Sequence, residues 1–130
     1  MSVFTQTELE YLCERKPERL GRIATVGRDG TPHVVPVGWR FNAELDTIDV
    51  GGMNLPRTKK FKDVRGSGRA AIVIDDLPST DPWQPRGIEV RGRAEAIEGE
   101  RPRIRIHAEW IVSWGLESQN LTDRHSRSVG

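Results

Sequence analysis

Apolar and polar residues alternate along several short stretches of this chain, a pattern typical of β-strands with one buried face. Turn residues separate the stretches, and Asp29-Gly30 is a strong hairpin signal between the first two of them. We predict six strands in this way, over residues 20–26, 33–41, 47–51, 69–74, 87–97 and 103–114. Pro36 lies inside the second stretch and has no N–H to donate, so it predicts a sheet edge, a bulge or a ligand-facing gap.

Two other segments carry helical signals. In residues 6–16 apolar side chains recur at helical spacing, and Thr5 opens a capping-box motif at their start. A basic helix is predicted from about residue 55 to residue 65, with Asn54 as its N-cap and Gly66-Ser67-Gly68 at its end.

Six strands at hairpin spacing with one or two short helices predict a mainly β fold, a small six-stranded antiparallel β-barrel. Residues 75–85 contain three prolines and are predicted to form an exposed loop. The chain has 130 residues, which is the size of one domain. We assign residues 1–116 to that domain and residues 117–130 to a polar C-terminal tail.

Composition limits the classes of partner. The formal net charge is +1, so the bulk charge does not indicate nucleic acid or an anionic membrane surface. No apolar run approaches the roughly 20 residues of a membrane span, and the first residues lack the pattern of a signal peptide. Cys13 is the only cysteine, so no internal disulfide is expected. A cytoplasmic protein is the natural expectation.

The positive charge is concentrated where a strand gives way to the basic helix. Residues 54–69 hold six basic residues and one acidic residue, a local net charge of +5. A solvated surface helix and an anion site are both open interpretations of this pattern. For an anion site capped by Asn54, the free N–H groups of the helix start would be joined by the side chains of Thr58, Lys59 and Lys60 in its first turn. Arg57 and Lys60 are three residues apart, so they are predicted to share one helix face and to flank the same anion.

The second candidate is the strand that contains Val35, Pro36, Val37 and Gly38. It is either an ordinary core strand or a platform for a flat heteroaromatic ring, because proline and glycine leave parts of its backbone unpaired or uncovered. The histidines are scattered without ligand spacing, so no metal site is expected. There is no dinucleotide fingerprint, P-loop or nucleophile elbow either.

Taken in order, four segments of the chain resemble the pyridoxamine 5′-phosphate oxidase-like proteins, whose fold is the FMN-binding split β-barrel, and within them the branch that uses the deazaflavin coenzyme F420. The segments are RIATVGRDGTPHVVPVGWRF (22–41), the basic helix with RAAIVIDD (57–76), RGIEVRGRAEAI (86–97) and RIRIHAEWIVSWGL (103–116).

The resemblance implies a homodimer with two cofactor sites at the subunit interface. Oxidases of this family hold the flavin phosphate with a Ser-Arg-Lys run, which Thr58-Lys59-Lys60 matches, and the strand along the ring matches Val34 to Val37. The family's phosphate-binding glutamine is replaced by Gly87, and the tail lacks the family's motif for vitamin B6 substrates.

These departures favour F420, whose phosphodiester and polyglutamate tail suit a basic groove, over FMN. The expected activity is hydride transfer between a reduced deazaflavin and a small organic acceptor. An FMN-dependent oxidase or reductase and a carrier that binds flavin, deazaflavin or haem without turnover are the alternatives. The expected cofactor-binding residues are Val35, Pro36, Val37, Gly38, Asn54, Arg57, Thr58, Lys59 and Lys60, and no catalytic residue stands out.

Overall fold

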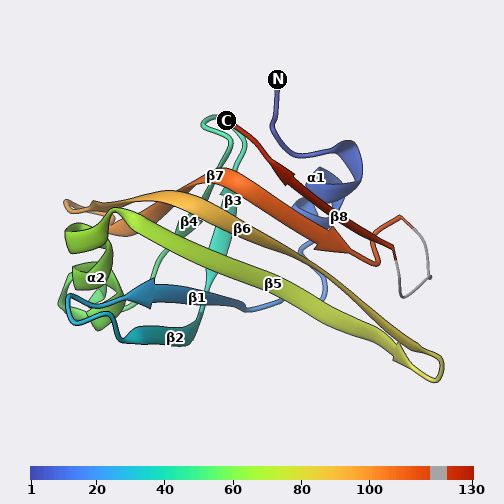
Figure 1. The fold of residues 1–130 in the computed structure, drawn as a ribbon, viewed down its shortest axis with the longest axis horizontal. Helices are drawn as coiled ribbons and strands as arrows, with labels where there is room; N and C mark the ends of the chain where they lie inside the picture. The colour runs from blue at the N-terminus through green and yellow to red at the C-terminus, as the bar shows by residue number, and fades with distance from the viewer. Residues whose placement is uncertain (118–122) are drawn as a thin grey trace.

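A curled antiparallel sheet forms the body of the protein in its computed structural model, which describes residues 1–117 and 123–130 (Figure 1). Two α-helices accompany the sheet in this described part: α1 (Gln6–Cys13) and α2 (Lys59–Ser67), the latter preceded by the 3-10 helix η1 (Leu55–Arg57). The strands of the described part are β1 (Gly21–Val26), β2 (Pro32–Val37), β3 (Trp39–Asn42), β4 (Thr47–Val50), β5 (Arg69–Thr80), β6 (Trp83–Ile97), β7 (Arg103–Trp114) and β8 (Arg124–Ser128). The predicted mainly β, split-barrel class is confirmed.

The strands follow the order β2-β1-β5-β6-β7-β4-β3, and β8 adds to β7 outside this path. All of these pairings are antiparallel. Strand β2 therefore lies at one end of the path with β1 as its neighbour. Of the alternatives for Pro36, the sheet edge is the one observed, because its missing N–H removes no bond from a second partner.

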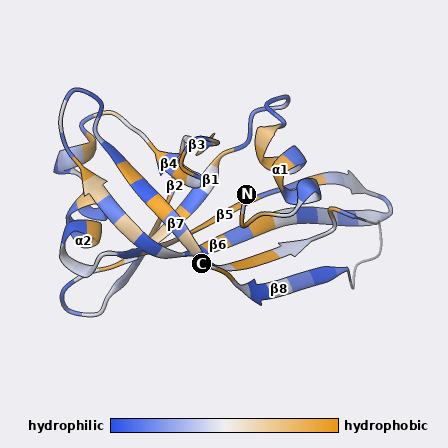
Figure 2. Ribbon diagram, turned by 90° about the horizontal axis from the view of Figure 1, so that it is seen from above, coloured by the Kyte–Doolittle hydropathy of each residue, from blue (hydrophilic) through white to orange (hydrophobic). Residues whose placement is uncertain are grey.

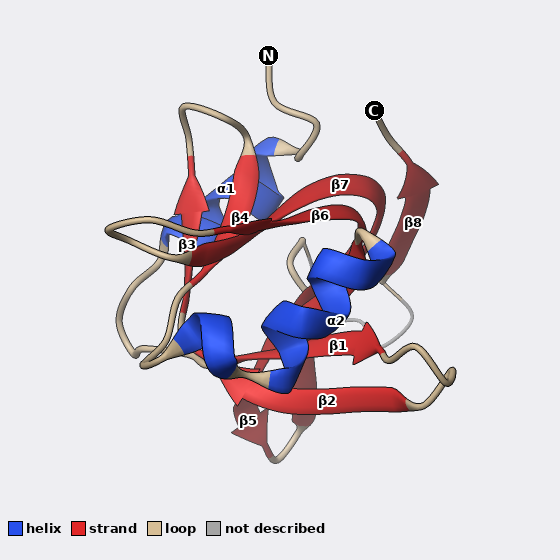
Figure 3. Ribbon diagram, turned by 90° about the vertical axis from the view of Figure 1, so that its left-hand side faces the viewer, coloured by secondary structure: helices blue, strands red, loops and turns tan. Residues whose placement is uncertain are grey.

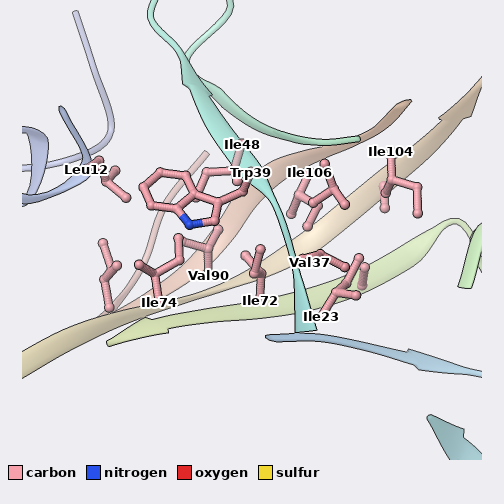
Figure 4. Packing of buried hydrophobic residues seen from close by; sticks show 14 of the residues in the cluster. Leu12, Ile23, Val37, Trp39, Ile48, Ile72, Ile74, Val90, Ile104 and Ile106 are labelled. Carbon is pink, nitrogen blue, oxygen red and sulfur yellow. The ribbon is translucent and has the colours of Figure 1, made fainter. Parts of the chain in front are cut away.

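The core lies on the concave side of the sheet and is rich in isoleucine. Every second residue of β1 is buried, and the same alternation recurs over residues 69–74 of β5, 88–94 of β6 and 103–107 of β7. Figure 2 shows hydrophobic and hydrophilic residues interleaved along the strands. Figure 4 shows that Trp39 points into the same cluster as side chains of β1, β5, β6 and β7. Helix α2 adds Phe61 and Val64, which are both fully buried. Burial of each such side chain stabilises the fold by about 1.5–3 kcal/mol, so the core fixes where α2 lies.

Helix α1 begins at the predicted capping box. The Thr5 hydroxyl accepts from the Glu8 N–H at 3.2 Å, and the Glu8 carboxylate accepts from the Thr5 N–H at 2.9 Å. The helix ends at Cys13, three residues before the predicted end, because the Arg19 guanidinium donates to the carbonyls of Tyr11 and Glu14. No helix in the described ranges is long and apolar enough to cross a membrane.

Residues 1–117 and 123–130 form eight strands where six were predicted for the chain. Gly38 divides the second predicted strand into β2 and β3. The predicted loop 75–85 is instead the outer part of the β5–β6 hairpin, which extends from the barrel as a long arm (Figure 1). The arm is held by a two-pronged ion pair between Asp76 and Arg86, at 2.8 and 2.9 Å, and by the Tyr11 hydroxyl, which donates to Asp76 at 2.8 Å.

The second half of the predicted tail also differs from expectation, because Arg124–Ser128 forms β8 on the edge of β7. Its Arg127 side chain reaches across to α1, where it donates to both carboxylate oxygens of Glu8 at 2.7 and 3.0 Å. Residues 118–122 of that predicted tail lie outside the described residues.

Candidate functional site

The basic segment forms a corner between β4 and α2. The corner consists of the 3-10 turn η1 followed by the first turn of α2. Thr58 is both the C-cap of η1 and the N-cap of α2, and its hydroxyl accepts from the Phe61 N–H at 3.3 Å. The prediction that Asn54 caps this helix is wrong: Asn54 is exposed, adopts a left-handed conformation (φ 51°) and makes no side-chain cap bond. Gly68 (φ 70°) ends α2 as predicted.

Two further expectations for this corner are corrected. The Thr58 hydroxyl also donates to the Leu55 carbonyl at 2.6 Å, so it holds the corner together and is not a free donor for a phosphate. Arg57 belongs to η1 and Lys60 to α2, so they do not share one helix face as their spacing predicted. Arg57 is exposed.

A pocket of about 380 Å³ opens between the first turn of α2 and the sheet edge formed by β1 and β2. Figure 3 shows α2 beside these two strands. Thr25 is paired with His33, and Ile23 with Val35, so side chains of both strands face the helix. We call this space the α2 pocket; its lining residues are Ile23, Thr25, His33, Val34, Val35, Thr58, Lys59 and Lys60.

The structure thus brings together four of the nine predicted cofactor-binding residues: Val35, Thr58, Lys59 and Lys60. The other five do not line the α2 pocket. Val37 is part of the core, and Pro36 is paired with Arg22 on the opposite face of the sheet from Val35. Gly38 lies between β2 and β3, while Asn54 and Arg57 lie earlier in the corner.

Beneath the pocket lies a buried carboxylate that the sequence did not reveal as a site residue. The Asp63 side chain is only 2% exposed and accepts from the Thr25 hydroxyl at 2.8 Å. Its other contacts are the Lys59 ammonium at 3.1 Å and Nδ1 of His33 at 3.2 Å. Burial alone would raise the pKa of Asp63, but the hydrogen bonds from Thr25 and Lys59 hold it below its usual value. Asp63 is therefore ionised at neutral pH.

These contacts distribute the charge of the pocket unevenly. The positive charge of Lys59 is offset by Asp63 one turn later in α2. Lys60 is half-buried and forms no ion pair with any residue in the ranges 1–117 and 123–130. The N–H groups of Lys59 and Lys60 precede the first intrahelical donor, Lys62, so the helix supplies no acceptor for them. One uncompensated cation and two backbone donors thus lie at the positive end of α2.

Gly87, the first departure noted in the sequence, is buried at the junction of β5, β6 and β7. A Cβ atom there would lie 2.7 Å from Cβ of Asp75, 2.7 Å from Cζ2 of Trp114 and 2.8 Å from the Ile74 carbonyl oxygen. The last of these is backbone and cannot rotate away. A glutamine at this position would therefore need the strands to move apart, and the local packing explains why glycine stands here.

The histidines differ in their surroundings. His33 contacts Asp63, and His107 contacts Glu95 at 2.5 Å. His125 lies 3.3 Å from Glu117 and 3.1 Å from Asp123, and one ligand atom of each of these three residues lies within 4.8 Å of the others. The sequence spacing gave no indication of this exposed group, which lies at the other end of the sheet from the α2 pocket.

The curled antiparallel sheet with helices α1 and α2 defines a split β-barrel of the pyridoxamine 5′-phosphate oxidase-like type. The sequence matches the pyridoxamine 5′-phosphate oxidase family over residues 8–128, and the chain belongs to that family.

Among curated relatives, the chain is 39% identical over 135 residues to the 5a,11a-dehydrotetracycline/5a,11a-dehydrooxytetracycline reductase of Streptomyces rimosus, with 97% of this chain and 93% of the relative covered. Among solved structures, it resembles a heme binding protein from Mycobacterium smegmatis, with a TM-score of 0.72 and 14% identity over 97% of this chain and 59% of that one. It also resembles an F420 reductase, with a TM-score of 0.60 and 19% identity over 78% of this chain and 94% of that one. At these identities the two structures show a shared fold.

Proposed function

We propose that this protein is an oxidoreductase that binds the deazaflavin F420 in the α2 pocket and uses its reduced form to deliver hydride to a small organic acceptor. The observation that carries the proposal is the pairing of an apolar wall, Ile23 and Val35, with the unpaired cation Lys60 at the helix start. One part of such a pocket suits a flat ring and the other a phosphate. The family membership and the reductase among its relatives support this class of activity.

The residues fit a phosphodiester with a polyanionic tail. Lys60 and the first-turn N–H groups of α2 would hold the phosphate, and the exposed Arg57 would meet negative charge further along the corner. The packing around Gly87 disfavours FMN, because it leaves no room for a side chain that could contact the flavin phosphate there. F420 is therefore preferred over FMN in the proposal.

When bound, the deazaflavin supplies the hydride, and the protein positions it. Val35 and Ile23 would keep water from one face of the ring, and the edge strand β2 would leave the other face open to an acceptor. Because the relative from Streptomyces rimosus is named for dehydrotetracycline compounds, acceptors of that type are the first to test.

A homodimer is part of the same proposal. On the face of β1 and β2 that is turned away from the core, Val26 and Val34 are exposed. Ala24, which is paired with Val34, extends this small apolar surface. A second copy covering this face would exclude water from the neighbouring α2 pocket. Light scattering should then give twice the chain mass of 14.7 kDa, and a monomer that binds cofactor fully would contradict this part.

The cofactor choice is tested by parallel titrations with F420 and FMN, followed by fluorescence. We expect saturable binding of F420 and weaker binding of FMN. Preference for FMN would overturn the choice of cofactor. Binding without oxidation of reduced F420 by any of a panel of dehydrotetracycline-type and other unsaturated acceptors would favour the carrier instead.

Lys60→Ala should weaken F420 binding by about tenfold or more, because a charge-assisted hydrogen bond contributes about 1.5–3 kcal/mol. Lys62→Ala is the matched control, since Lys62 is an exposed lysine of the same helix that does not line the α2 pocket. Equal affinities of the two variants would show that the phosphate does not lie at Lys60.

A further inference from the structure

His33 is the one histidine among the residues that line the α2 pocket, and nothing in the proposed function so far uses it. It is half-buried, lies on the inner face of β2 and is held from below by Asp63. Its role follows from which of its two ring nitrogens carries a proton.

The contact with Asp63 assigns that proton. An ionised carboxylate can only accept hydrogen bonds, so Nδ1 of His33, at 3.2 Å from Oδ2 of Asp63, must be the donor. The uncharged ring then has its lone pair on Nε2, the nitrogen on the far side of the ring from Asp63. A lone pair repels an anion, whereas a protonated Nε2 donates to one.

We propose that His33 takes up a proton when an anion enters the α2 pocket, so that the hold on the phosphate of the cofactor strengthens as the pH falls. This inference rests on the proposed function, because the anion in question is that phosphate. The imidazolium would join Lys60 as a second cationic donor, and Asp63 would keep the ring oriented in both charge states.

The groups around His33 carry charges of both signs, so an added anion would shift the ring toward its protonated form. From α2, Asp63 favours the imidazolium, while Lys59 and Lys60 oppose it. From the β1–β2 turn, Asp29 lies beside the ammonium of Lys59, and Arg28 is exposed. Thr25 on β1 is uncharged.

Lys59 and His33 border the same space between the β1–β2 turn and α2. A Cβ atom built on Gly27 would lie 3.3 Å from Oδ1 of Asp29, 3.3 Å from Nζ of Lys59 and 3.4 Å from Cε1 of His33. The ammonium, the imidazole and the Asp29 carboxylate therefore border one small volume. An anion that contacts the Lys59 ammonium there would lie close to the imidazole and would favour protonation of the ring, against the repulsion of the Asp29 carboxylate.

The experiment compares the pH dependence of anion binding in the wild type and in His33→Gln. Sulfate is the first probe, because it carries no proton that titrates between pH 6 and 8; binding is followed by NMR of the α2 amides and of histidines labelled at Cε1. F420 is the second, followed by fluorescence, and its own titration cancels in the comparison of the two proteins. We expect the affinity of the wild type for both ligands to rise by up to about tenfold for each unit by which the pH is lowered, because one proton is taken up with each anion.

In His33→Gln the extra pH dependence should disappear, while a neutral donor remains. His107→Gln is the matched control, because His107 is equally exposed and also bonded to a carboxylate, but lies outside the pocket. It should behave as the wild type.

The outcomes separate the two hypotheses. If F420 and sulfate bind with the same pH dependence in the wild type and in His33→Gln, the role of His33 is wrong and the cofactor site stands. If the Cε1 resonance of His33 reports no change of charge when sulfate saturates the α2 amides, the inference fails in the same way. If neither ligand perturbs α2 in the wild type, the proposed function itself fails.

Discussion

Two buried carboxylates, Glu8 and Asp63, lie at opposite ends of the sheet and differ in what surrounds them. The Glu8 side chain, 2% exposed, accepts from the Ser113 hydroxyl at 2.8 Å and from both terminal nitrogens of Arg127. Asp63 is equally buried, but its partners are a hydroxyl, a solvent-exposed ammonium and an imidazole.

The two carboxylates differ in the kind of partner that each contacts. A guanidinium keeps its proton at any pH a folded protein meets, so Glu8 and Arg127 form a neutral pair for as long as Glu8 is ionised, and this pair joins β8 to α1. Asp63 instead contacts His33, which borders the α2 pocket and is proposed above to take up a proton together with an anion. Glu8 thus stabilises the fold through a partner that stays charged, whereas Asp63 contacts the histidine that would respond to an anion.

Arg127→Ala should have the largest effect. It leaves the Glu8 carboxylate buried without a cation, which costs about 3–5 kcal/mol of unfolding free energy. Urea denaturation measures the loss. Arg124→Ala removes an exposed arginine of the same strand and should change stability by less than about 0.5 kcal/mol. Similar losses in the two variants would mean that β8 as a whole, and not the buried pair, stabilises this end.

Asp63→Asn should cost less, about 1–3 kcal/mol, because asparagine keeps an acceptor for Thr25 and because Lys59 and His33 remain partly hydrated. Glu98→Gln is the control, since it breaks an exposed ion pair between Glu98 and Arg65 of the same helix and should be nearly neutral. A loss as large as that of Arg127→Ala would erase the distinction between the two acids.

The dependence of folding stability on pH tests the same comparison. Burial would raise the pKa values of Glu8 and Asp63, but the hydrogen bonds to Arg127 and to Thr25 and Lys59 hold them below the ordinary values of 4.5 and 3.8. The folded protein then binds fewer protons than the unfolded chain, so this stabilisation is complete above about pH 5 and declines as the pH falls through the folded pKa values. The stability gap between wild type and Asp63→Asn should therefore narrow between pH 7 and pH 3. A constant gap would mean that the carboxylate charge does not matter.

Gly27→Ala should have the smallest effect on stability, below about 1 kcal/mol, since its new methyl group meets the flexible end of Lys59. It should still weaken sulfate binding a few-fold, because it displaces Lys59 or His33 from their shared space. Gly66→Ala, in α2 with nothing within 4 Å of its Cβ position, should leave sulfate binding unchanged. Unchanged binding in Gly27→Ala as well would place the anion elsewhere in the pocket.

Local sequence signals predicted the local structure well. The capping box at Thr5, the edge position of Pro36 and the end of α2 at Gly68 all follow from the chemistry of one or a few adjacent residues. The helix start was misplaced at Asn54 because Pro56, typical of a first turn, opens η1 and not α2.

Contacts between distant residues decided the rest. The arm at residues 75–85 continues as strands because Asp76 contacts Arg86 and Tyr11. The local sequence, with three prolines among mostly polar residues, does not indicate these contacts. His33 and Asp63 are 30 residues apart, and their meeting depends on how α2 packs on β1. Thr58 to Lys60 could be placed from the resemblance, whereas the acid beneath them could not.

The bond between Arg127 and Glu8 also has a consequence for the order in which the chain folds. It joins residues 119 positions apart, and closing so long a loop has a large entropic cost until the intervening strands have paired. The two ends of the chain therefore meet late, after the sheet is in place. A fluorescent or exchange probe at β8 would report the last step of folding, while a probe on the β1–β2 hairpin, whose paired residues are close in sequence, would report one of the first.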